Sequence, residues 1–323
     1  MILVAGGAGY IGSHVVKRLG ERGYDLLVYD NLSQGHREMV TRGRLIQGDL
    51  SETDRLEELF REHGVTAVMH FAAHCLVGES EIDPHKYYLN NVVNTLGLLD
   101  AMLKAGVRRI VFSSSAAVYG EPLGVPIEED HPTTPTNVYG RTKLIVEHVL
   151  EKYTSAYGLE YASLRYFNAA GADEGGALGE DHKPESHLIP LVLDVALGRK
   201  EAITIFGTDY DTPDGTCIRD YIHVNDLAEA HILALESLAA KGRSSVFNLG
   251  NGRGFSVREV IRTAERVTGK RIVTVEGNRR QGDPARLVAS SARIMEQLGW
   301  RPARADLETI VATAWNFHRR RFS

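Results

Sequence analysis

Short apolar runs alternate with segments of helical periodicity through the first half of the chain. Apolar runs of strand length, bounded by polar or glycine-rich turns, predict six buried strands, at residues 2–4, 25–30, 45–48, 67–73, 109–113 and 161–167. Apolar residues that recur every three or four positions predict helices between these strands, at 10–19, 54–63, 84–106 and 138–157. Strands that alternate with helices predict an α/β fold with a doubly wound, mostly parallel sheet.

The alternation weakens after Asn168, where residues 169–185 are rich in glycine, alanine and acids and predict a long connecting loop. Beyond this loop, the pattern predicts helices at 188–197, 224–238, 257–268 and 307–317 and short strands at 203–206 and 246–250. We therefore expect two domains, residues 1–168 and a smaller α+β domain of residues 169–323, with some later segments returning to the first domain.

Composition excludes several classes of protein. The 323 residues carry a net charge of −5, which argues against a nucleic-acid-binding surface. Only two cysteines occur, too few for a disulfide framework, and no apolar run approaches the length of a membrane span. The first residues form a strand and lack the basic segment of a signal peptide, so we expect a cytoplasmic protein.

The thirteen histidines give no metal-binding pattern in the sequence. His70 and His74 are four residues apart, but they lie where a strand runs into a loop, so a shared helical face is not expected. His182 and His187 lie in a polar loop beside Asp181 and Glu185. Because no site shows three converging ligands at a familiar spacing, we predict no metal.

A glycine-rich turn joins the first strand to the first helix. Gly6, Gly9 and Gly12 follow the apolar residues 2–4, and helical periodicity begins at Tyr10. Glycine permits the tight turn, lets a pyrophosphate approach the backbone, and lets helix and strand pack closely, so the pattern is typical of a Rossmann dinucleotide site. Asp30 ends the next strand at the position of a ribose-binding acid, which favours NAD because a 2′-phosphate would be repelled.

Candidate catalytic residues follow the fifth strand. Ser113 to Ser115 end that strand, where ligands bind in such sheets. Tyr139 and Lys143 are four residues apart in a helix and so share a face. A tyrosine, with an ordinary pKa of about 10, is a poor base at neutral pH, but a neighbouring lysine cation and a nicotinamide both favour the phenolate.

Several motifs together resemble the extended short-chain dehydrogenase/reductase family over essentially the whole chain. They are GGAGYIGSH, HFAA followed by VGES, SSSAAVYG, YGRTK, RYFN and RDYIHVNDLA. The resemblance is to members that interconvert UDP-glucose and UDP-galactose, an isomerase reaction. It implies that Tyr139, Lys143 and Ser115 are catalytic, and that hydride passes transiently from sugar C4 to a tightly bound NAD, leaving a 4-keto intermediate.

The resemblance also implies binding roles in both domains. NAD contacts are expected from Gly6, Gly9, Tyr10, Ile11, Gly12, Asp30, Asn31, Asp49, Leu50, Phe71, Ala72, Ala73, Asn90, Ser113, Lys143 and Tyr166. UDP-sugar contacts are expected from Ser115, Tyr139, Asn168, His187, Leu188, Phe206, Arg219, Tyr221, Arg280 and Asp283. A homodimer is implied, paired through helices near 90–105 and 138–157.

Two positions bear on how closely the chain follows the family. Cys75 stands where some members have a lysine that touches the cofactor, which predicts looser retention of NAD. Leu287 stands where a side chain limits the room beside the sugar 2-position, which predicts weak turnover of UDP-N-acetylglucosamine.

Three alternatives remain open to different degrees. A sugar-nucleotide 4,6-dehydratase needs an acid–base pair after the strand-end residue, but Ala116 and Ala117 stand there and cannot transfer protons. Epimerases of UDP-glucuronate, UDP-pentoses or UDP-N-acetylhexosamines would use the same three catalytic residues. A non-catalytic NAD sensor would lose Tyr139 or Lys143, and both are present.

Overall fold

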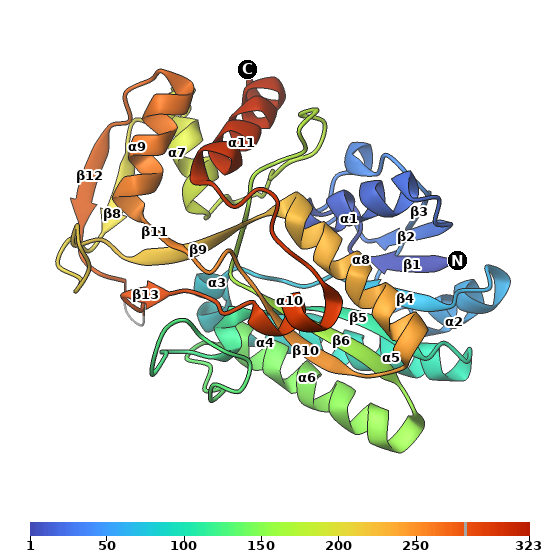
Figure 1. The fold of residues 1–323 in the computed structure, drawn as a ribbon. Coiled ribbons are helices and arrows are strands. Elements are labelled where there is room, and N and C mark those ends of the chain that lie inside the picture. The colour runs from blue at the N-terminus through green and yellow to red at the C-terminus, as the bar shows by residue number, and fades with distance from the viewer. Residues whose placement is uncertain (281–282) are drawn as a thin grey trace. The chain divides into compact units, whose positions relative to one another are not determined.

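A computed structural model describes residues 1–280 and 283–323. The chain forms two compact units, each described here by itself (Figure 1). Unit 1 comprises Met1–Gly120, Pro132–Arg165 and Ala228–Phe247, and unit 2 comprises Glu121–His131, Tyr166–Leu227 and Asn248–Ser323. The main division falls close to the expected break after residue 168, while residues 121–131 group with unit 2 and residues 228–247 return to unit 1.

Unit 1 is built on a seven-stranded sheet in the order β10-β6-β5-β4-β1-β2-β3. Its strands are β1 (Ile2–Ala5), β2 (Leu26–Asp30), β3 (Arg44–Gln47), β4 (Ala67–His70), β5 (Arg109–Ser115), β6 (Glu160–Tyr166) and β10 (Ser245–Leu249). The pairs that join β3, β2, β1, β4 and β5 are all parallel. The predicted doubly wound α/β fold is therefore confirmed. The VFNLG strand, expected in the second domain, instead joins this sheet as β10 beside β6.

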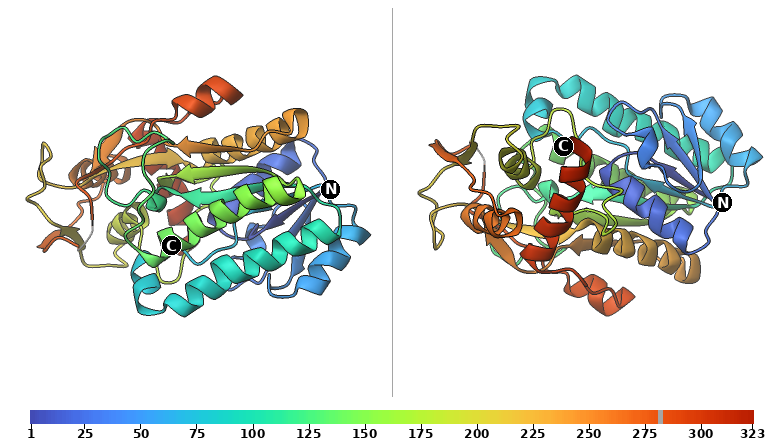
Figure 2. Two further views of the ribbon diagram at one scale, coloured as in Figure 1. Left: turned by 90° about the horizontal axis from the view of Figure 1, so that it is seen from below. Right: turned by 90° about the horizontal axis from the view of Figure 1, so that it is seen from above.

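Helices cover both faces of this sheet. They are α1 (Tyr10–Glu21), α2 (Thr53–Glu62), α3 (Val77–Ile82), α4 (Pro84–Tyr88), α5 (Asn94–Lys104), α6 (Val138–Tyr157) and the unit 1 part of α8 (Val224–Lys241). Figures 1 and 2 show α1 and α8 on one face and α5 and α6 on the other. Buried residues such as Leu56, Leu99 and Leu150 of α2, α5 and α6 pack with the strands in one apolar core.

The predicted helix over residues 84–106 is interrupted. A π-helical segment, η2 (Leu89–Val93), separates α4 from α5, and two short 3-10 turns, η1 (Arg37–Met39) and η3 (Ala116–Val118), complete the unit. The spacing of the apolar residues fits an α-helix and a π-helix about equally, so the sequence pattern does not reveal the π-helical turn.

Among its described residues, unit 2 has two small sheets and four helices of its own. In one sheet β9 (Ile218–His223) pairs with β7 (Asn168–Ala170), β11 (Gly254–Ser256) and β13 (Arg286–Leu287); in the other, β8 (Ile203–Phe206) pairs with β12 (Thr274–Gly277). The helices are α7 (Leu188–Ala196), α9 (Val257–Thr268), α10 (Ala292–Leu298) and α11 (Leu307–Phe322). Val192, Val260 and Ile310 pack α7, α9 and α11 together in its core.

Across the described residues, none of the helices has the length and apolarity needed to traverse a lipid bilayer.

Candidate functional site

The turn after β1 leaves space for a ligand at one of its three glycines. Gly6 has φ of +77°, and a Cβ there would lie 2.4 Å from the Ala72 nitrogen. A Cβ on Gly12 would lie 2.2 Å from the Gly6 oxygen, so chain packing alone requires both glycines. At Gly9 the nearest atom, the Gly6 oxygen, is 3.5 Å away, an ordinary contact. Packing within the chain therefore does not explain Gly9, whereas a pyrophosphate lying against the backbone does.

Gly9 is also the N-cap of α1, and no side chain caps this end of the helix. Tyr10 and Ile11 form the first turn, whose backbone N–H groups have no partner within the helix. Such a helix end attracts a phosphate through its N–H groups and its dipole.

Asp30 ends β2 beside this turn. Its Oδ2 accepts the Ala8 N–H at 2.9 Å and its Oδ1 accepts the Leu32 N–H at 2.8 Å. Burial raises the pKa of Asp30, and the two backbone donors partly oppose this shift. Because each oxygen retains a lone pair, the carboxylate is able to accept two ribose hydroxyls.

The end of β3 carries a second acidic residue. Asn31 Nδ2 donates to Asp49 Oδ2 at 2.7 Å, and the Ser51 N–H and hydroxyl donate to Asp49 Oδ1 at 2.9 and 2.7 Å. Burial raises the pKa of Asp49, but these donors outweigh burial and lower it overall. Leu50 follows, buried. The charged carboxylate of Asp49 and the apolar side chain of Leu50 are therefore neighbours. An adenosine requires both kinds of contact.

The end of β4 is held by β1. The Phe71 and Ala72 N–H groups both donate to the Ala5 oxygen, and Ala73 continues the half-buried segment. The Phe71 ring packs against the His231 ring at a tilt of 42°, with centroids 4.8 Å apart. These contacts hold the backbone of Phe71 and Ala72 directly against Gly6.

Asn90 and Asn91 are adjacent in the chain, and Asn91 is the buried one of the two. It exchanges hydrogen bonds with the backbone of His74 and donates to Thr142 Oγ1 at 3.1 Å. Asn90, the predicted cofactor residue, is half-buried and donates to Asn91 Oδ1. The sequence analysis missed the role of Asn91 in joining this loop to α6, because two adjacent asparagines look alike in a sequence.

Lys143 is fully enclosed below the candidate catalytic tyrosine. Its Nζ donates to the Ser113 oxygen at 2.8 Å and lies 4.9 Å from the centre of the Phe112 ring and 5.8 Å from the centre of the Tyr139 ring. Burial lowers the pKa of Lys143 to about 8, against the opposing effects of Cys75 and Glu147. The structure therefore brings Lys143 to the aromatic face of Tyr139, as the four-residue spacing predicted.

Ser115 and Tyr139 belong to the same unit as Lys143. The Ser115 hydroxyl accepts the Ala117 N–H at 3.1 Å, and the Tyr139 N–H donates to Ser80 Oγ at 3.2 Å. Both side chains are about nine-tenths buried, at 9% and 8% exposure. This set of a serine, a tyrosine and a lysine is suited to moving a proton at an alcohol.

A buried polar network lies behind these residues, and the sequence analysis missed it. Glu147 of α6 forms a bidentate ion pair with Arg165 of β6, with oxygen–nitrogen distances of 2.5 and 2.9 Å. Ser114 of β5 donates to the same carboxylate at 2.6 Å, and Arg165 donates to the Tyr119 hydroxyl at 2.9 Å. The network fixes α6, which carries Tyr139 and Lys143, to the neighbouring strands β5 and β6.

Unit 2 holds a separate group of the predicted substrate residues. Arg219 of β9 forms an ion pair with Asp283. Arg280 lies over the ring of Phe206, 4.0 Å from its centre, and Arg279 lies over the ring of Tyr210, 4.3 Å from its centre. Arg279 also pairs with Asp209. The Arg280 cation over the exposed Phe206 ring is suited to an aromatic base and a phosphate.

Other predicted residues belong to unit 2, and two of them lie on neighbouring strands of the β9 sheet. Asn168 of β7 stands opposite Tyr221 of β9 and donates to the Asp220 oxygen at 3.1 Å. Tyr221 is buried, and burial raises its pKa. Tyr166 is half-buried at the end of β6, and Leu188 begins α7.

The loop before α7 differs from the expectation for its histidines. The structure brings Glu180, His182, Glu185 and His187 together, with one ligand atom of each within 4.8 Å of the others. The prediction that no three potential ligands converge was therefore wrong. A loop has no periodicity, so the spacing of its residues gives no sign that it folds back on itself.

The fold and these two groups of residues define a class of nucleotide-dependent enzymes. The family model of the NAD dependent epimerase/dehydratase family matches residues 2–250, and the chain belongs to that family.

Several of its relatives carry out one particular reaction of that family. A UDP-glucose 4-epimerase of Halalkalibacterium halodurans is 55% identical over 98% of this chain and 95% of its own length. The crystal structure of UDP-glucose 4-epimerase from Brucella ovis in complex with NAD matches at a TM-score of 0.96 and 50% identity, covering 98% of both chains. The crystal structure of UDP-glucose 4-epimerase from Bifidobacterium longum in complex with NAD⁺ and UDP matches at a TM-score of 0.93 and 38% identity. The match covers 99% of this chain and 98% of that chain.

Proposed function

We propose that the protein interconverts UDP-glucose and UDP-galactose by inverting the configuration at sugar C4. The observation that carries the proposal is the placement of Lys143 against the Ser113 backbone and the Tyr139 ring, in the unit that also carries the Gly9 opening and Asp30. The names of the full-length relatives support this reaction. NAD is the cofactor, and when bound it accepts the C4 hydride and later returns it.

Tyr139 moves the proton in this reaction. Its phenolate takes the proton of the sugar 4-hydroxyl as the C4–H bond breaks, which leaves a flat 4-keto sugar. When hydride returns to the opposite face of C4, Tyr139 gives the proton back to the oxygen, so protons and hydride balance over one turnover. General-base catalysis of this kind contributes roughly 10²- to 10⁴-fold to a rate.

Ser115 and Lys143 assist Tyr139. The buried ammonium of Lys143 stabilises the phenolate through its charge, and the effect is strong because water is excluded around it. The Ser115 hydroxyl, fixed by its bond from Ala117, is suited to hydrogen-bond the reacting sugar oxygen.

The predicted residues of unit 2 bind the nucleotide part of the substrate. We assign the diphosphate to Arg219 and Arg280, a ribose hydroxyl to Asp283, and the uracil to the region of Phe206, whose ring is 38% exposed. The remaining predicted contacts are Asn168, His187, Leu188 and Tyr221. A firmly held diphosphate with a loosely held hexose lets the 4-keto sugar turn between the two hydride transfers.

Substrate range is a finer proposal. Leu287 of β13 stands beside Arg219 of β9 in register and is half-buried. A branched side chain there leaves little room for an acetamido group, so we propose weak turnover of UDP-N-acetylglucosamine. The strongest competing chemistry, 4,6-dehydration, has no proton donor or acceptor at Ala116 and Ala117.

We further propose a homodimer in the cytoplasm. Leu89 and Val93 of η2 are 46% and 53% exposed, and η2 stands between α4 and α5 in the chain and contacts α6. Exposed apolar residues grouped in this way are typical of a subunit contact. Cys75 and Cys217 are not joined in a disulfide, which suits a reducing compartment.

Incubation with UDP-galactose, with no nicotinamide supplied, tests the reaction. We expect UDP-glucose to form in the wild type, and Tyr139→Phe to lower kcat at least a hundredfold. Tyr157→Phe is the matched control, because Tyr157 lies on the same helix and is 54% exposed. Unchanged turnover in Tyr139→Phe would refute the role of the phenol, and no turnover in the wild type would refute the reaction.

A further inference from the structure

The loop that leads into α7 holds two carboxylates and two imidazoles at close range. Glu180 Oε1 lies 3.2 Å from His182 Nδ1 and 2.7 Å from His187 Nδ1. The Glu185 carboxylate lies 3.8 Å from the same atom of His182 and 3.3 Å from that of His187. We call these four residues the 180–187 cluster. Each histidine directs its Nδ1 toward the same pair of carboxylates, so the four side chains converge on one point.

These separations match those between the ligands of a small metal ion. Ligand atoms about 2.1 Å from a tetrahedral Zn²⁺ are about 3.4 Å apart along each edge. The four imidazole–carboxylate distances of the cluster, 2.7 to 3.8 Å, lie on both sides of that value. All four ligand atoms lie within 4.8 Å of one another, so the side chains would need to draw together by up to about 1 Å to enclose the ion.

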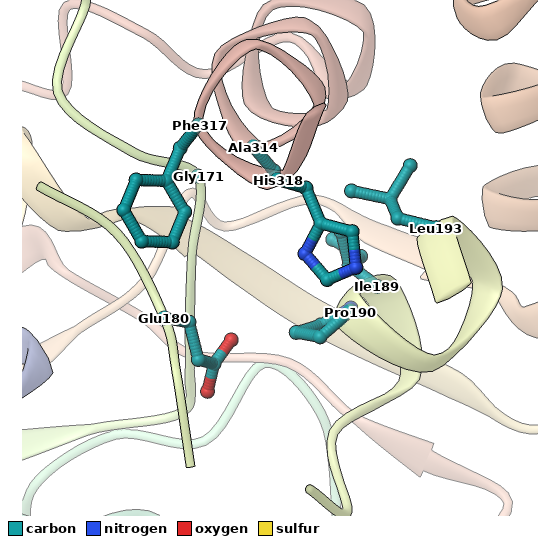
Figure 3. A pocket seen from close by; sticks show the side chains of 8 residues that line it. All are labelled: Gly171, Glu180, Ile189, Pro190, Leu193, Ala314, Phe317 and His318. Atoms are coloured by element: carbon teal, nitrogen blue, oxygen red, sulfur yellow. The ribbon is translucent and has the colours of Figure 1, made fainter. Parts of the chain in front are cut away.

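The charge of the cluster also favours a divalent cation. Glu180 is 7% exposed and lines a cavity of about 10 Å³ whose other walls include Ile189, Pro190 and Phe317 (Figure 3). Among the described residues, the cations that pair with Glu180 and Glu185 are the two imidazoles alone. The ring centres of the two histidines are 5.5 Å apart, so both imidazoles lie close to the two carboxylates. One divalent ion balances the same charge with both histidines neutral.

The backbone already holds one ligand in place. Glu185 Oε1 accepts the N–H groups of Ser186 and His187 at 2.7 and 2.8 Å, which fixes its carboxylate at the start of α7. The other oxygen, Oε2, faces His182. Orientation of a metal ligand by a second hydrogen bond of this kind is a regular feature of protein metal sites.

We propose that Glu180, His182, Glu185 and His187 bind one divalent transition-metal ion of the zinc class. Two imidazoles and two carboxylates are a ligand set that Zn²⁺ accepts, and imidazole disfavours Mg²⁺ and Ca²⁺. The ion fastens the loop of residues 180–187 to the first turn of α7.

A second consequence rests on the proposed function. An ion on Nδ1 of His187 leaves Nε2 as the protonated nitrogen of that ring, and the His187 side chain is 45% exposed. His187 then serves as a fixed N–H donor to the nucleotide. Metal removal should thus raise the KM for UDP-galactose more than it lowers kcat.

Metal content and spectroscopy test the site independently of turnover. The full-length protein is treated with EDTA, dialysed, loaded with Zn²⁺ or Co²⁺, freed of excess ion and measured by plasma mass spectrometry. We expect one Zn²⁺ per chain, with a zinc absorption edge fitted by nitrogen and oxygen ligands and a strong visible band for four-coordinate Co²⁺. His182→Ala and Glu185→Gln should each weaken Zn²⁺ binding about tenfold or more.

His85→Ala is the matched control, because His85 is an exposed histidine of unit 1. It should retain the wild-type stoichiometry. Wild-type protein that keeps no more zinc than Glu185→Gln would overturn the proposal, as would Co²⁺ spectra of a six-coordinate, water-rich ion. Neither result depends on whether UDP-galactose is the substrate, so failure of the site and failure of the proposed function are distinguishable.

Discussion

At the scale of single residues, the two glycines of the β1–α1 turn are required for different reasons. Gly6 has a positive φ, and a Cβ there would collide with the Ala72 backbone, whereas Gly9 has an ordinary φ of −78° and a Cβ there would make only an ordinary contact with the Gly6 oxygen. The first requirement is internal to the chain, and we attribute the second to the cofactor.

We predict that Gly9→Ala folds normally but loses NAD. Its free energy of unfolding should change by less than about 1 kcal/mol, while the NAD recovered per purified chain falls severalfold. Gly6→Ala should instead lose more than about 2 kcal/mol, because the backbone strain and the contact with Ala72 both oppose folding. Urea unfolding and release of NAD by acid provide the two measurements. Equal NAD content in Gly9→Ala and wild type would contradict the assignment.

Burial of Lys143 leads to two predictions: activity should fall as the pH rises, whereas the contribution of Lys143 to stability should increase. Its pKa is lowered to about 8, so the ammonium that supports Tyr139 is lost as the pH rises through that value. We expect kcat/KM to fall above about pH 8, and Lys143→Arg, although slower, to lack that decline because a guanidinium keeps its charge.

The contribution of Lys143 to the free energy of unfolding changes with pH in the opposite direction. Between pH 8 and the ordinary lysine range the unfolded chain binds more protons at this residue than the folded chain does, so its contribution to stability rises with pH. The difference between wild type and Lys143→Arg in urea unfolding at pH 8 and pH 10 isolates this contribution. A rate that stays constant from pH 7 to 10 would contradict the role of the ammonium.

At the scale of elements, α6 is held to β5 and β6 by a buried ion pair as well as by apolar packing. Arg165 and Glu147 are 8% and 5% exposed, and their ion pair lies one turn from Lys143 along the helix. Loss of one partner would leave the other as an uncompensated charge in the protein interior.

We predict that Glu147→Ala lowers the free energy of unfolding by about 3–5 kcal/mol. Glu151→Ala, one turn further along and 63% exposed at its side chain, is the matched control and should change it by less than about 0.5 kcal/mol. Chemical denaturation of both variants measures the difference. A Glu147→Ala protein as stable as the control would show that packing alone holds α6.

The predictability of the fold differs between its elements for physical reasons. The inner strands of unit 1 were predictable because a strand covered on both faces is apolar at nearly every position, as in residues 67–70. The strand predicted at residues 45–48 was expected to be buried, but β3 is half-exposed. The π-helical turn at 89–93 was not predictable, because its apolar spacing resembles that of an α-helix. That β10 belongs to this sheet was not predictable either, because a sequence pattern predicts that a strand forms but not which strands pair with it.

The site residues divide in the same way. Gly9, Asp30, Tyr139 and Lys143 follow from local spacing, since the turn and the helix face place them within one or two elements. Arg219 and Asp283, 64 residues apart, meet only through the pairing of β9 and β13, so the family resemblance alone suggested them. The 180–187 cluster has no periodic pattern, and only the coordinates reveal it.

At the scale of the whole molecule, we predict a homodimer that charge on η2 disrupts. Val93→Asp places a carboxylate on an exposed apolar position without altering a buried one, so the chain should fold but elute as a monomer. Light scattering gives the mass directly. Ile82→Asp, at an apolar position 86% exposed outside η2, should leave the dimer intact. A monomeric wild type would remove the proposal.

The central claim is that one hydride leaves C4 and returns to the same carbon. UDP-galactose deuterated at C4 tests it, because a hydride held on a nicotinamide does not exchange with water. The account predicts UDP-glucose that retains the deuterium at C4 in ordinary water. UDP-glucose carrying solvent hydrogen at C4 would contradict the account, since it would mean that the carbon had lost a proton instead of a hydride.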